Sequence, residues 1–213
     1  LDPKLHNWVG RVRQLDLTAE NQEQEIAFCP VRWVPIPVFS GDQPPFDSPV
    51  GEQAHREGPF SEKGPTWVGP WFDYNPFLSW YFLGYHTGAD LNKSGGGDAD
   101  KNAPVYTIGD GIVTFSGRGT GSWGNIIVIE HADAQVTLPN GQQHRQTVYS
   151  RYGHLSDQLL AKTGDLVKRG QQVGFIGLAA GQSTGWHLHF DISYTDMLKK
   201  RPSHWPDMTK IKQ

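Results

Sequence analysis

The chain has 213 residues, with 19 Lys or Arg and 22 Asp or Glu, so its formal net charge at pH 7 is -3. This length accommodates one generous domain, or a domain of about 150 residues with an extension, and it excludes an elaborate multidomain enzyme. The charged residues are interspersed along the chain, which is not the pattern of a nucleic-acid surface or of a polybasic membrane patch. We therefore expect no nucleic acid among the partners.

The composition favours a β fold. The 25 Gly, 15 Pro and 8 Trp describe a turn-rich chain, and long apolar stretches with a period of 3.6 residues are hard to find. The single cysteine, Cys29, excludes an intramolecular disulfide and leaves the compartment open. We expect no membrane span in this chain, and its start at Leu1 fits a mature or trimmed protein without its upstream targeting segment.

Residues 1–46 differ in character from the rest of the chain. The stretch "CPVRWVPIPVFSGDQPP" alternates apolar residues with prolines, which is typical of an edge strand or an extended arm. Glycine-punctuated short segments follow, so we predict an N-terminal extension over residues 1–46 and a domain over residues 47–213. The extension either packs against a sheet edge, which we favour, or acts as an inhibitory arm.

The domain is predicted to be all-β. We interpret residues 59–85, which are rich in Pro, Gly and aromatic side chains, as a long loop near a site or as core aromatics. Six short strands at regular spacing follow, which predicts antiparallel sheets. The "LPNGQQ" stretch is expected to close a hairpin. The predicted strands are residues 103–108, 111–117, 124–131, 146–155, 171–177 and 187–194.

Two histidines stand one residue apart in "GWHLHFDI". Side chains alternate between the faces of a strand, so His187 and His189 point one way while Trp186, Leu188 and Phe190 point the other way. The pair by itself fits two half-buried histidines that are satisfied by hydrogen bonds. Other metal-type ligands in similar surroundings would favour a metal site instead.

Such ligands occur upstream, in "GYHTGADLN". Because Gly84 and Gly88 favour a turn over a helix, the imidazole of His86 and the carboxylate of Asp90 are expected to reach one point. Together with His189 they supply two nitrogens and one oxygen, which suits a catalytic Zn²⁺ with its fourth position left for water. Manganese or iron tolerates the same donors, whereas a structural zinc site would more often use cysteines.

A zinc-bound water that acts as the nucleophile also needs a proton acceptor. His187, on the same strand face as His189, is one candidate, and His154 in "RYGHLS" is another. An imidazole with its ordinary pKa of about 6.5 is suited to this task at neutral pH. Neither residue has to be a metal ligand.

The motifs "HTGAD", "YGHLS", "GDLVKRGQQVGFIG" and "STGWHLHFD" occur in an order that resembles the lysostaphin-type zinc endopeptidases, which cut peptide cross-links of the bacterial cell wall. The resemblance runs from about residue 47 to about residue 195. It implies antiparallel sheets of the duplicated-hybrid or barrel-sandwich type, a peptidoglycan peptide as substrate, and an extracytoplasmic location that is secreted, periplasmic or cell-wall associated. It also implies that the Zn²⁺ ligands are His86, Asp90 and His189. The implied catalytic pair, which deprotonates the water and stabilises the oxyanion, is His154 and His187.

The sequence departs from the family pattern in four places. Trp186 stands where the family usually has Pro, and Asp191 where it commonly has Glu, so we expect altered packing and no loss of zinc. Insertions over residues 92–102 and 132–146 predict unusual loops around the site. Within the first insertion, we interpret Asp98 to Asn102 as a solvated turn and not as a calcium loop.

Two other classes of protein compete with the enzyme. A catalytically silent module of the same fold, which binds cell wall or activates an amidase, is expected to have lost ligands, whereas all five positions are filled here. A phosphoryl or acyl carrier does not need both the His86–Asp90 motif and the His187–His189 motif.

In this family an upstream segment can place an asparagine on the zinc and occlude the groove. Nothing in the sequence selects among Asn7, Asn21 and Asn75 for this role. The remaining histidines are interpreted as ordinary surface or packing residues, namely His6, His55, His131, His144 and His204. Three tryptophans either line a substrate groove or are buried packing residues, which we favour, namely Trp71, Trp123 and Trp186.

Overall fold

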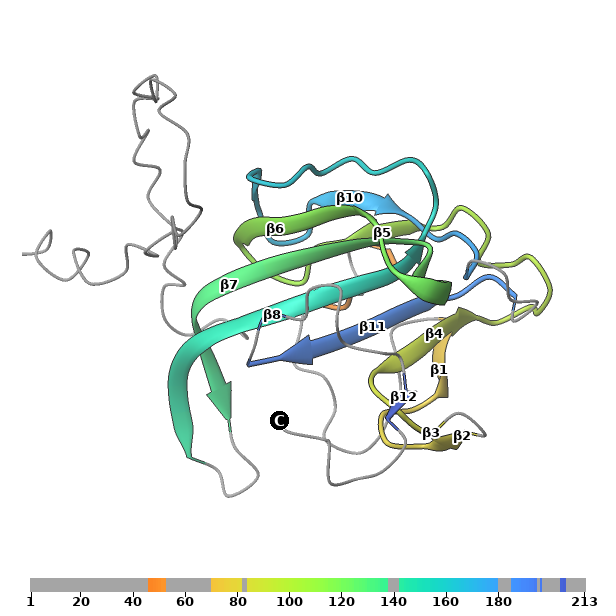
Figure 1. Ribbon diagram of the computed structural model, residues 1–213, viewed down its shortest axis with the longest axis horizontal. Helices are drawn as coiled ribbons and strands as arrows, with labels where there is room; N and C mark the ends of the chain where they lie inside the picture. Colours follow the sequence, from red (N-terminus) through yellow and green to blue (C-terminus); the bar gives the residue numbers. More distant parts are fainter. Residues whose placement is uncertain are drawn as a thin grey trace, which may run out of the picture. The chain divides into compact units, whose positions relative to one another are not determined.

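A computed structural model describes most of the predicted domain (Figure 1). The predicted extension lies outside the described residues except for Phe46, so the extension and the boundary near Asp47 stay predictions. Among the described residues, no helix has the length and apolarity needed to cross a membrane. The described residues are 46–52, 70–81, 84–137, 142–179, 185–194, 196 and 204–205.

Seven strands form the main antiparallel sheet, in the order β1-β4-β11-β8-β7-β6-β9. Two small sheets accompany it, with the orders β10-β5 and β12-β3-β2. The strands of the main sheet are β1 (Trp71–Asn75), β4 (Ala89–Lys93), β6 (Gly111–Arg118), β7 (Asn125–Thr137), β8 (Gln143–Leu155), β9 (Leu166–Val167) and β11 (Leu188–Ser193). The others are β2 (Trp80–Tyr81), β3 (Gly84–His86), β5 (Pro104–Tyr106), β10 (Gln172–Phe175) and β12 (His204–Trp205), and a short 3-10 helix, η2 (Gly121–Trp123), precedes β7.

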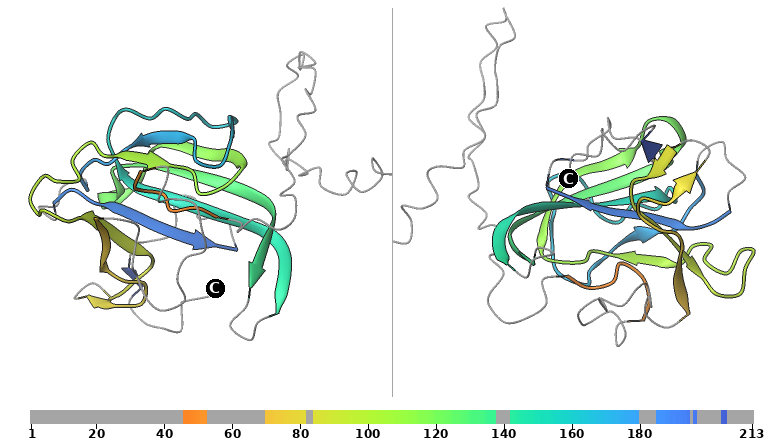
Figure 2. Two further views of the ribbon diagram at one scale, coloured as in Figure 1. Left: turned by 180° about the vertical axis from the view of Figure 1, so that it is seen from behind. Right: turned by 90° about the horizontal axis from the view of Figure 1, so that it is seen from below.

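The core lies between the main sheet and the β5–β10 pair, which covers one of its faces (Figures 1 and 2). Val105 and Val173 of the small sheet are fully buried in one cluster with Ile127 and Ile129 of β7. Burial of alternate apolar side chains is the main driving force for this arrangement. The prediction of an all-β fold with antiparallel sheets is confirmed.

The hairpin predicted around "LPNGQQ" is also confirmed. Strands β7 and β8 have 13 residues each. They pair in antiparallel fashion from Asn125 opposite Leu155 to Thr137 opposite Gln143. The register shifts between His131 and Ala134, a bulge where the two strands bend together.

The interpretation of residues 59–85 as a long loop is wrong for the part of it that the structure describes. This part forms β1, β2 and the first residues of β3. Trp71 is 7% exposed in the core cluster, so the alternative of core aromatics holds for it. Pro70 and Pro76 flank β1 and do not interrupt it, and its aromatic residues suit a half-buried strand.

Candidate metal and catalytic site

Three neighbouring strands carry the predicted metal ligands. His86 is the last residue of β3, while Asp90 lies on β4 and His189 on β11. The two strands β4 and β11 are hydrogen-bonded neighbours, and Asp90 stands directly opposite His189. Directly opposed residues of an antiparallel pair project to the same face. The sheet register therefore brings together side chains that are 99 residues apart in the chain.

The turn between His86 and Asp90 lies against β11. A Cβ atom added at Gly88 would lie 2.5 Å from the carbonyl oxygen of Phe190 and 2.8 Å from Nε2 of His189. Only glycine lets the two backbones approach this closely. The turn that the sequence predicts here is confirmed, and glycine is required by its close contact with the neighbouring strand.

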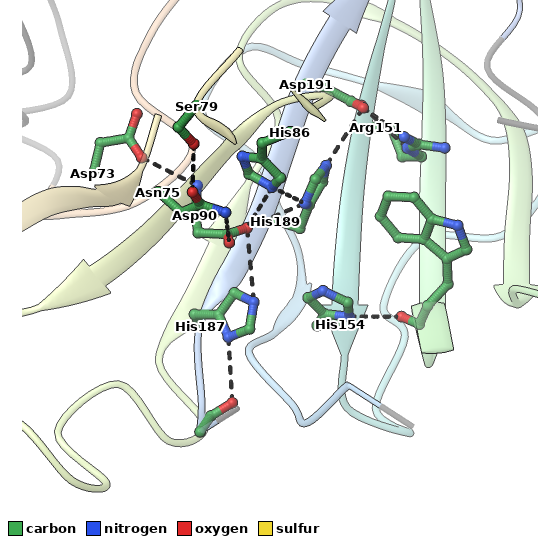
Figure 3. A network of polar contacts seen from close by, with 12 residues as sticks. Asp73, Asn75, Ser79, His86, Asp90, Arg151, His154, His187, His189 and Asp191 are labelled. Carbon is green, nitrogen blue, oxygen red and sulfur yellow. Dashed lines mark hydrogen bonds and ion pairs between the residues drawn. The ribbon is translucent and has the colours of Figure 1, made fainter. Parts of the chain in front are cut away.

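One atom of each predicted ligand points to a common centre, as Figure 3 shows. Nε2 of His86 lies 3.1 Å from Nδ1 of His189 and 3.2 Å from Oδ1 of Asp90. The distance from Nδ1 of His189 to the same carboxylate oxygen is 3.1 Å. In a tetrahedral zinc site with bonds of 2.0–2.1 Å, neighbouring donor atoms are about 3.3 Å apart. The three atoms thus form a nearly equilateral triangle of the size that zinc requires.

Hydrogen bonds alone do not account for this triangle. A ring nitrogen carries at most one proton, which lies in the ring plane and points in one direction. If both imidazoles donate to Asp90, their N–H groups face each other at 3.1 Å. A cation that binds the two ring nitrogens and the carboxylate oxygen satisfies all three atoms at once. The donor set of His86, Asp90 and His189 therefore fits a divalent metal ion of the zinc type.

The carboxylate of Asp90 is held in its charged form. Burial alone would raise its pKa, but hydrogen bonds from His189 and His86 bring that pKa well below its usual range. Its second oxygen, Oδ2, accepts a hydrogen bond of 3.2 Å from Nδ2 of Asn75, and its backbone N–H donates to Asp73 over 3.2 Å. Burial raises the pKa of Asp73 to about 6. Asn75, one of the three candidate asparagines, thus lies beside the predicted ligands, whereas Asn7 and Asn21 lie outside the described residues.

A buried ion pair stands behind His189. Nε2 of His189 lies 3.5 Å from Oδ2 of Asp191, at the outer limit of a hydrogen bond. Asp191 in turn accepts two hydrogen bonds from Arg151, with distances of 3.1 Å and 2.5 Å. Burial opposes the charge of Asp191, but the adjacent guanidinium lowers its pKa to about 2. A carboxylate on the far nitrogen orients a ligand histidine so that Nδ1 faces the metal.

The two predicted catalytic histidines lie beside the ligand triangle (Figure 3). His187 directly precedes β11, and its Nε2 is 3.7 Å from Oδ1 of Asp90. His154 lies near the end of β8, and its ring centroid is 4.7 Å from that of His187. Both side chains are buried, with exposed fractions of 7% for His187 and 6% for His154. All five sequence-predicted residues therefore meet in one place.

Backbone carbonyls define the tautomers of both rings. Nδ1 of His154 lies 3.1 Å from the carbonyl oxygen of Trp123, and Nδ1 of His187 lies 3.2 Å from that of Gly185. Because a carbonyl only accepts, each Nδ1 carries the proton and each neutral ring presents Nε2 as an acceptor. Burial lowers the pKa of both histidines, and for His154 the proximity of His187 and His189 lowers it further. Both rings are therefore neutral at pH 7.

The first insertion is ordered against the site. Asp100, at 2% exposure, is buried, so the interpretation of this stretch as a solvated turn is wrong at that residue. Its Oδ2 accepts hydrogen bonds of 3.2 Å from Asn92 and 3.4 Å from the backbone of Lys93. Nδ2 of Asn92 also donates to the carbonyl oxygen of Trp186 over 3.2 Å, directly before His187. The insertion thus contacts the segment that carries the histidine pair.

The sequence analysis missed three polar residues around the site, namely Asp73, Asp100 and Arg151, and it named Asn75 only as one of three candidate inhibitory asparagines. The alternation of Asp73 and Asn75 in "WFDYN" is the signal that would have placed them on one strand. Of the histidines interpreted as ordinary, His131 is buried and His144 is exposed. His6 and His55 lie outside the described residues, and only the backbone of His204 is described.

The family profile of "Peptidase family M23" matches residues 141–202. This segment includes His154, His187 and His189, while His86 and Asp90 precede it. A solved structure titled as a zinc containing peptidase from Vibrio cholerae covers 70% of this chain at 30% identity, with a TM-score of 0.44, and the chain covers 37% of it.

Curated relatives match in about half of the chain. Peptidoglycan DD-endopeptidase ShyB of Vibrio cholerae is 40% identical over 100 residues, which is 47% of this chain and 19% of that protein. DD-carboxypeptidase/endopeptidase Mpg of Neisseria meningitidis is 35% identical over 106 residues, 50% of this chain and 19% of that protein. The chain thus spans about a fifth of the length of these relatives. In agreement with the resemblance found in the sequence, residues 141–202 of this chain match peptidase family M23, and the matching relatives are named endopeptidases.

Proposed function

We propose that this protein is a zinc-dependent endopeptidase that hydrolyses amide bonds in the stem or cross-bridge peptides of peptidoglycan. The observation that carries the proposal is the triangle of donor atoms from His86, Asp90 and His189, with sides of 3.1 to 3.2 Å. A site with three protein ligands leaves room for a reactant at the fourth position, as in catalytic zinc sites. Bound zinc would polarise the scissile carbonyl and lower the pKa of the attacking water.

His154 and His187 would supply the proton transfer. Both present an unprotonated Nε2, because their Nδ1 atoms face the carbonyls of Trp123 and Gly185. One ring would take the proton of the attacking water on Nε2 and deliver it to the leaving amine. The other would accept a hydrogen bond from the same water and orient it, and it would donate to the developing oxyanion only after its own Nε2 is protonated. Burial lowers the pKa of both rings, which keeps them unprotonated at neutral pH.

Peptidoglycan is the substrate class that the names of the relatives support. ShyB is named a peptidoglycan DD-endopeptidase and Mpg a DD-carboxypeptidase/endopeptidase. Since peptidoglycan lies outside the cytoplasmic membrane, we place the protein in an extracytoplasmic compartment. A site with all five predicted positions filled favours the enzyme over a catalytically silent binding module of the same fold.

The decisive experiment measures metal content and hydrolysis together. We expect purified protein to contain about one zinc per chain and to release peptide amines from purified peptidoglycan. His189→Ala should lose both properties, whereas His144→Ala, which removes an exposed imidazole on β8, should retain both. Stoichiometric zinc without hydrolysis of any type of peptidoglycan would favour the binding module. Absence of zinc from the wild-type protein after growth with zinc would overturn the proposal.

A further inference from the structure

Resting on the proposed function, we propose that Trp123 is a positioning residue. Trp123 fixes the orientation of the His154 ring for proton transfer, and its indole packs against the proposed metal ligand His189. Trp123 is the last residue of η2 and is only 5% exposed. It is not a metal ligand, and its contribution acts through the two histidines.

Trp123 contacts His154 in two ways. Its carbonyl oxygen accepts the hydrogen bond from Nδ1 of His154 over 3.1 Å. Its indole also stacks on the imidazole, with 5.7 Å between the ring centroids and 22° between the planes. The carbonyl sets the tautomer and the indole restricts rotation of the ring. His154 itself has a φ of 57°, in the left-handed region that is uncommon for residues other than glycine. Such backbone strain persists where the surroundings hold it.

The same indole contacts the metal side of the site. Its ring centroid lies 4.7 Å from that of His189, and the two planes are nearly perpendicular at 88°. Edge-to-face contacts of this kind are favourable and directional. Trp123 therefore touches one histidine of the ligand triangle and one of the catalytic pair. A displacement of the indole would change the position of His154 relative to the metal.

Two features hold the indole in place. The guanidinium carbon of Arg151 lies 3.8 Å from the centroid of the Trp123 ring, and Arg151 is itself fixed by the buried pair with Asp191. Below the ring, the backbone of Gly153 leaves the necessary space. A Cβ atom at Gly153 would lie 2.9 Å from two carbon atoms of the indole and 3.4 Å from Cβ of His189. The φ of Gly153 lies outside the left-handed region, so the indole and not the backbone requires glycine here.

The test changes each partner of the contact between the Trp123 indole and Gly153. Trp123→Ala removes the indole and leaves the carbonyl, whereas Gly153→Ala leaves the indole and displaces it. We expect each variant to keep about one zinc per chain and to lower kcat by about 10- to 100-fold, with KM changed less than threefold. The double variant should be no slower than Trp123→Ala, because the added methyl group then meets no indole. Trp123→Phe should recover most of kcat, since a smaller aromatic ring still stacks on His154.

A second readout does not depend on turnover. The ring ¹⁵N shifts of His154 should report a single tautomer with the proton on Nδ1 in the wild-type protein. In Trp123→Ala the carbonyl remains, but the ring is no longer restrained by the indole and rotates away from that carbonyl, so a mixture of tautomers is expected. Trp71→Phe is the matched control, because Trp71 is likewise a buried tryptophan but belongs to the core cluster, which includes none of the five histidine and aspartate positions. It should lower the melting temperature and leave kcat and the His154 spectrum unchanged.

Several results would overturn the inference. These are a kcat of Trp123→Ala within threefold of the wild type, a loss of activity that follows the loss of zinc, or independent effects of Trp123→Ala and Gly153→Ala that multiply in the double variant. An unchanged His154 tautomer in Trp123→Ala would also contradict it. Failure of the wild-type protein to hydrolyse any peptidoglycan would instead contradict the proposed function, and the His154 spectra would still decide the positioning role.

Discussion

Buried histidines lie at two places in the structure, one at His131 and one at the candidate site, and their ring nitrogens are satisfied in different ways. Each nitrogen of His131 on β7 has its own partner, with 2.8 Å from Nδ1 to the carbonyl oxygen of Asp110 and 2.8 Å from Nε2 to Oγ of Ser150. At the candidate site, nitrogens of His86 and His189 instead converge on one oxygen of Asp90. The packing histidine His131 thus has separate partners, whereas the two proposed ligand histidines share one carboxylate oxygen.

The pKa values of His131 and of the site histidine His189 are shifted in opposite directions. Burial lowers the pKa of His131 to about 4, and no carboxylate close to the ring compensates enough to restore it. Burial also disfavours the charge of His189, but the carboxylates of Asp191 and Asp90 outweigh it and raise the pKa above its ordinary value. The histidine at the site is surrounded by negative charge that a cation can neutralise. Four predictions test this contrast.

The largest effect is expected from Asp90→Ala. Removing the shared oxygen leaves two imidazoles without the anionic ligand, so zinc and hydrolysis should both be lost below detection. A chelator should lower the melting temperature of the wild-type protein, since a ligand that binds only the folded state stabilises it, and should leave that of Asp90→Ala unchanged. Metal analysis and thermal unfolding with and without chelator check this. Full zinc occupancy in the variant would show that Asp90 is not a ligand.

The next effect separates the catalytic pair from the ligands. His154→Ala should retain zinc and lower kcat by about 100- to 10,000-fold, the usual contribution of a general acid or base. Kinetics with a defined peptide and metal analysis of the same sample check it. Equal loss of zinc in His154→Ala and in His189→Ala would assign both residues to metal binding.

A smaller effect on zinc affinity is expected from Asp191, which contacts the proposed ligand His189 on the side away from the metal. Asp191→Asn removes the charge that faces Nε2 of His189 and should weaken zinc binding by about 10- to 100-fold, as for other groups that orient ligand histidines. Competition with a zinc indicator measures the affinity. Asp191→Glu is the matched control, because the family commonly has Glu here, and it should stay closer to the wild type. Equal affinities of the Asn and Glu variants would contradict the role of the charge.

The smallest functional effect is expected at His131, where His131→Gln should leave zinc and kcat unchanged. The folded-state pKa of about 4 lies below the ordinary 6.5. Between these values the unfolded chain binds more protons, so the free energy of unfolding should fall as pH falls from 6.5 to 4, by about 3 kcal/mol for this group. Urea unfolding at several pH values should show a shallower slope in the variant. An unchanged slope would show that His131 is not the group responsible.

Local patterns predicted a large part of the fold and five of the polar residues that meet at the candidate site. The alternation in "GWHLHFDI" is confirmed, because His187 and His189 both face Asp90 while Leu188 and Phe190 enter the core. The hairpin and the later strands followed from turn chemistry and short apolar runs, which are properties of neighbouring residues. The roles of the site residues in metal binding and catalysis stay predictions.

These local patterns did not predict contacts between segments that are far apart in the sequence. The strand β1 is rich in aromatics and flanked by prolines, and its pairing with β4 depends on a neighbour that local spacing does not reveal. The same holds for Trp123, whose contact with His154 is not evident from its sequence surroundings, and for Asp100, which accepts a hydrogen bond from Asn92. Long-range pairing decides these positions, and one sequence contains little direct information about it.

The close approach of Gly88 to β11 has a consequence for the comparison of sequences. A residue with a Cβ atom there would collide with the backbone of Phe190 and the ring of His189, so it would separate the two strands that carry the ligands. Chains that keep His86 and Asp90 but have a larger residue at position 88 are therefore poor candidates for the same geometry. In a search for further proteins of this architecture, the discriminating pattern is H-x-G-x-D together with H-x-H, since the glycine reports on the distance between the strands.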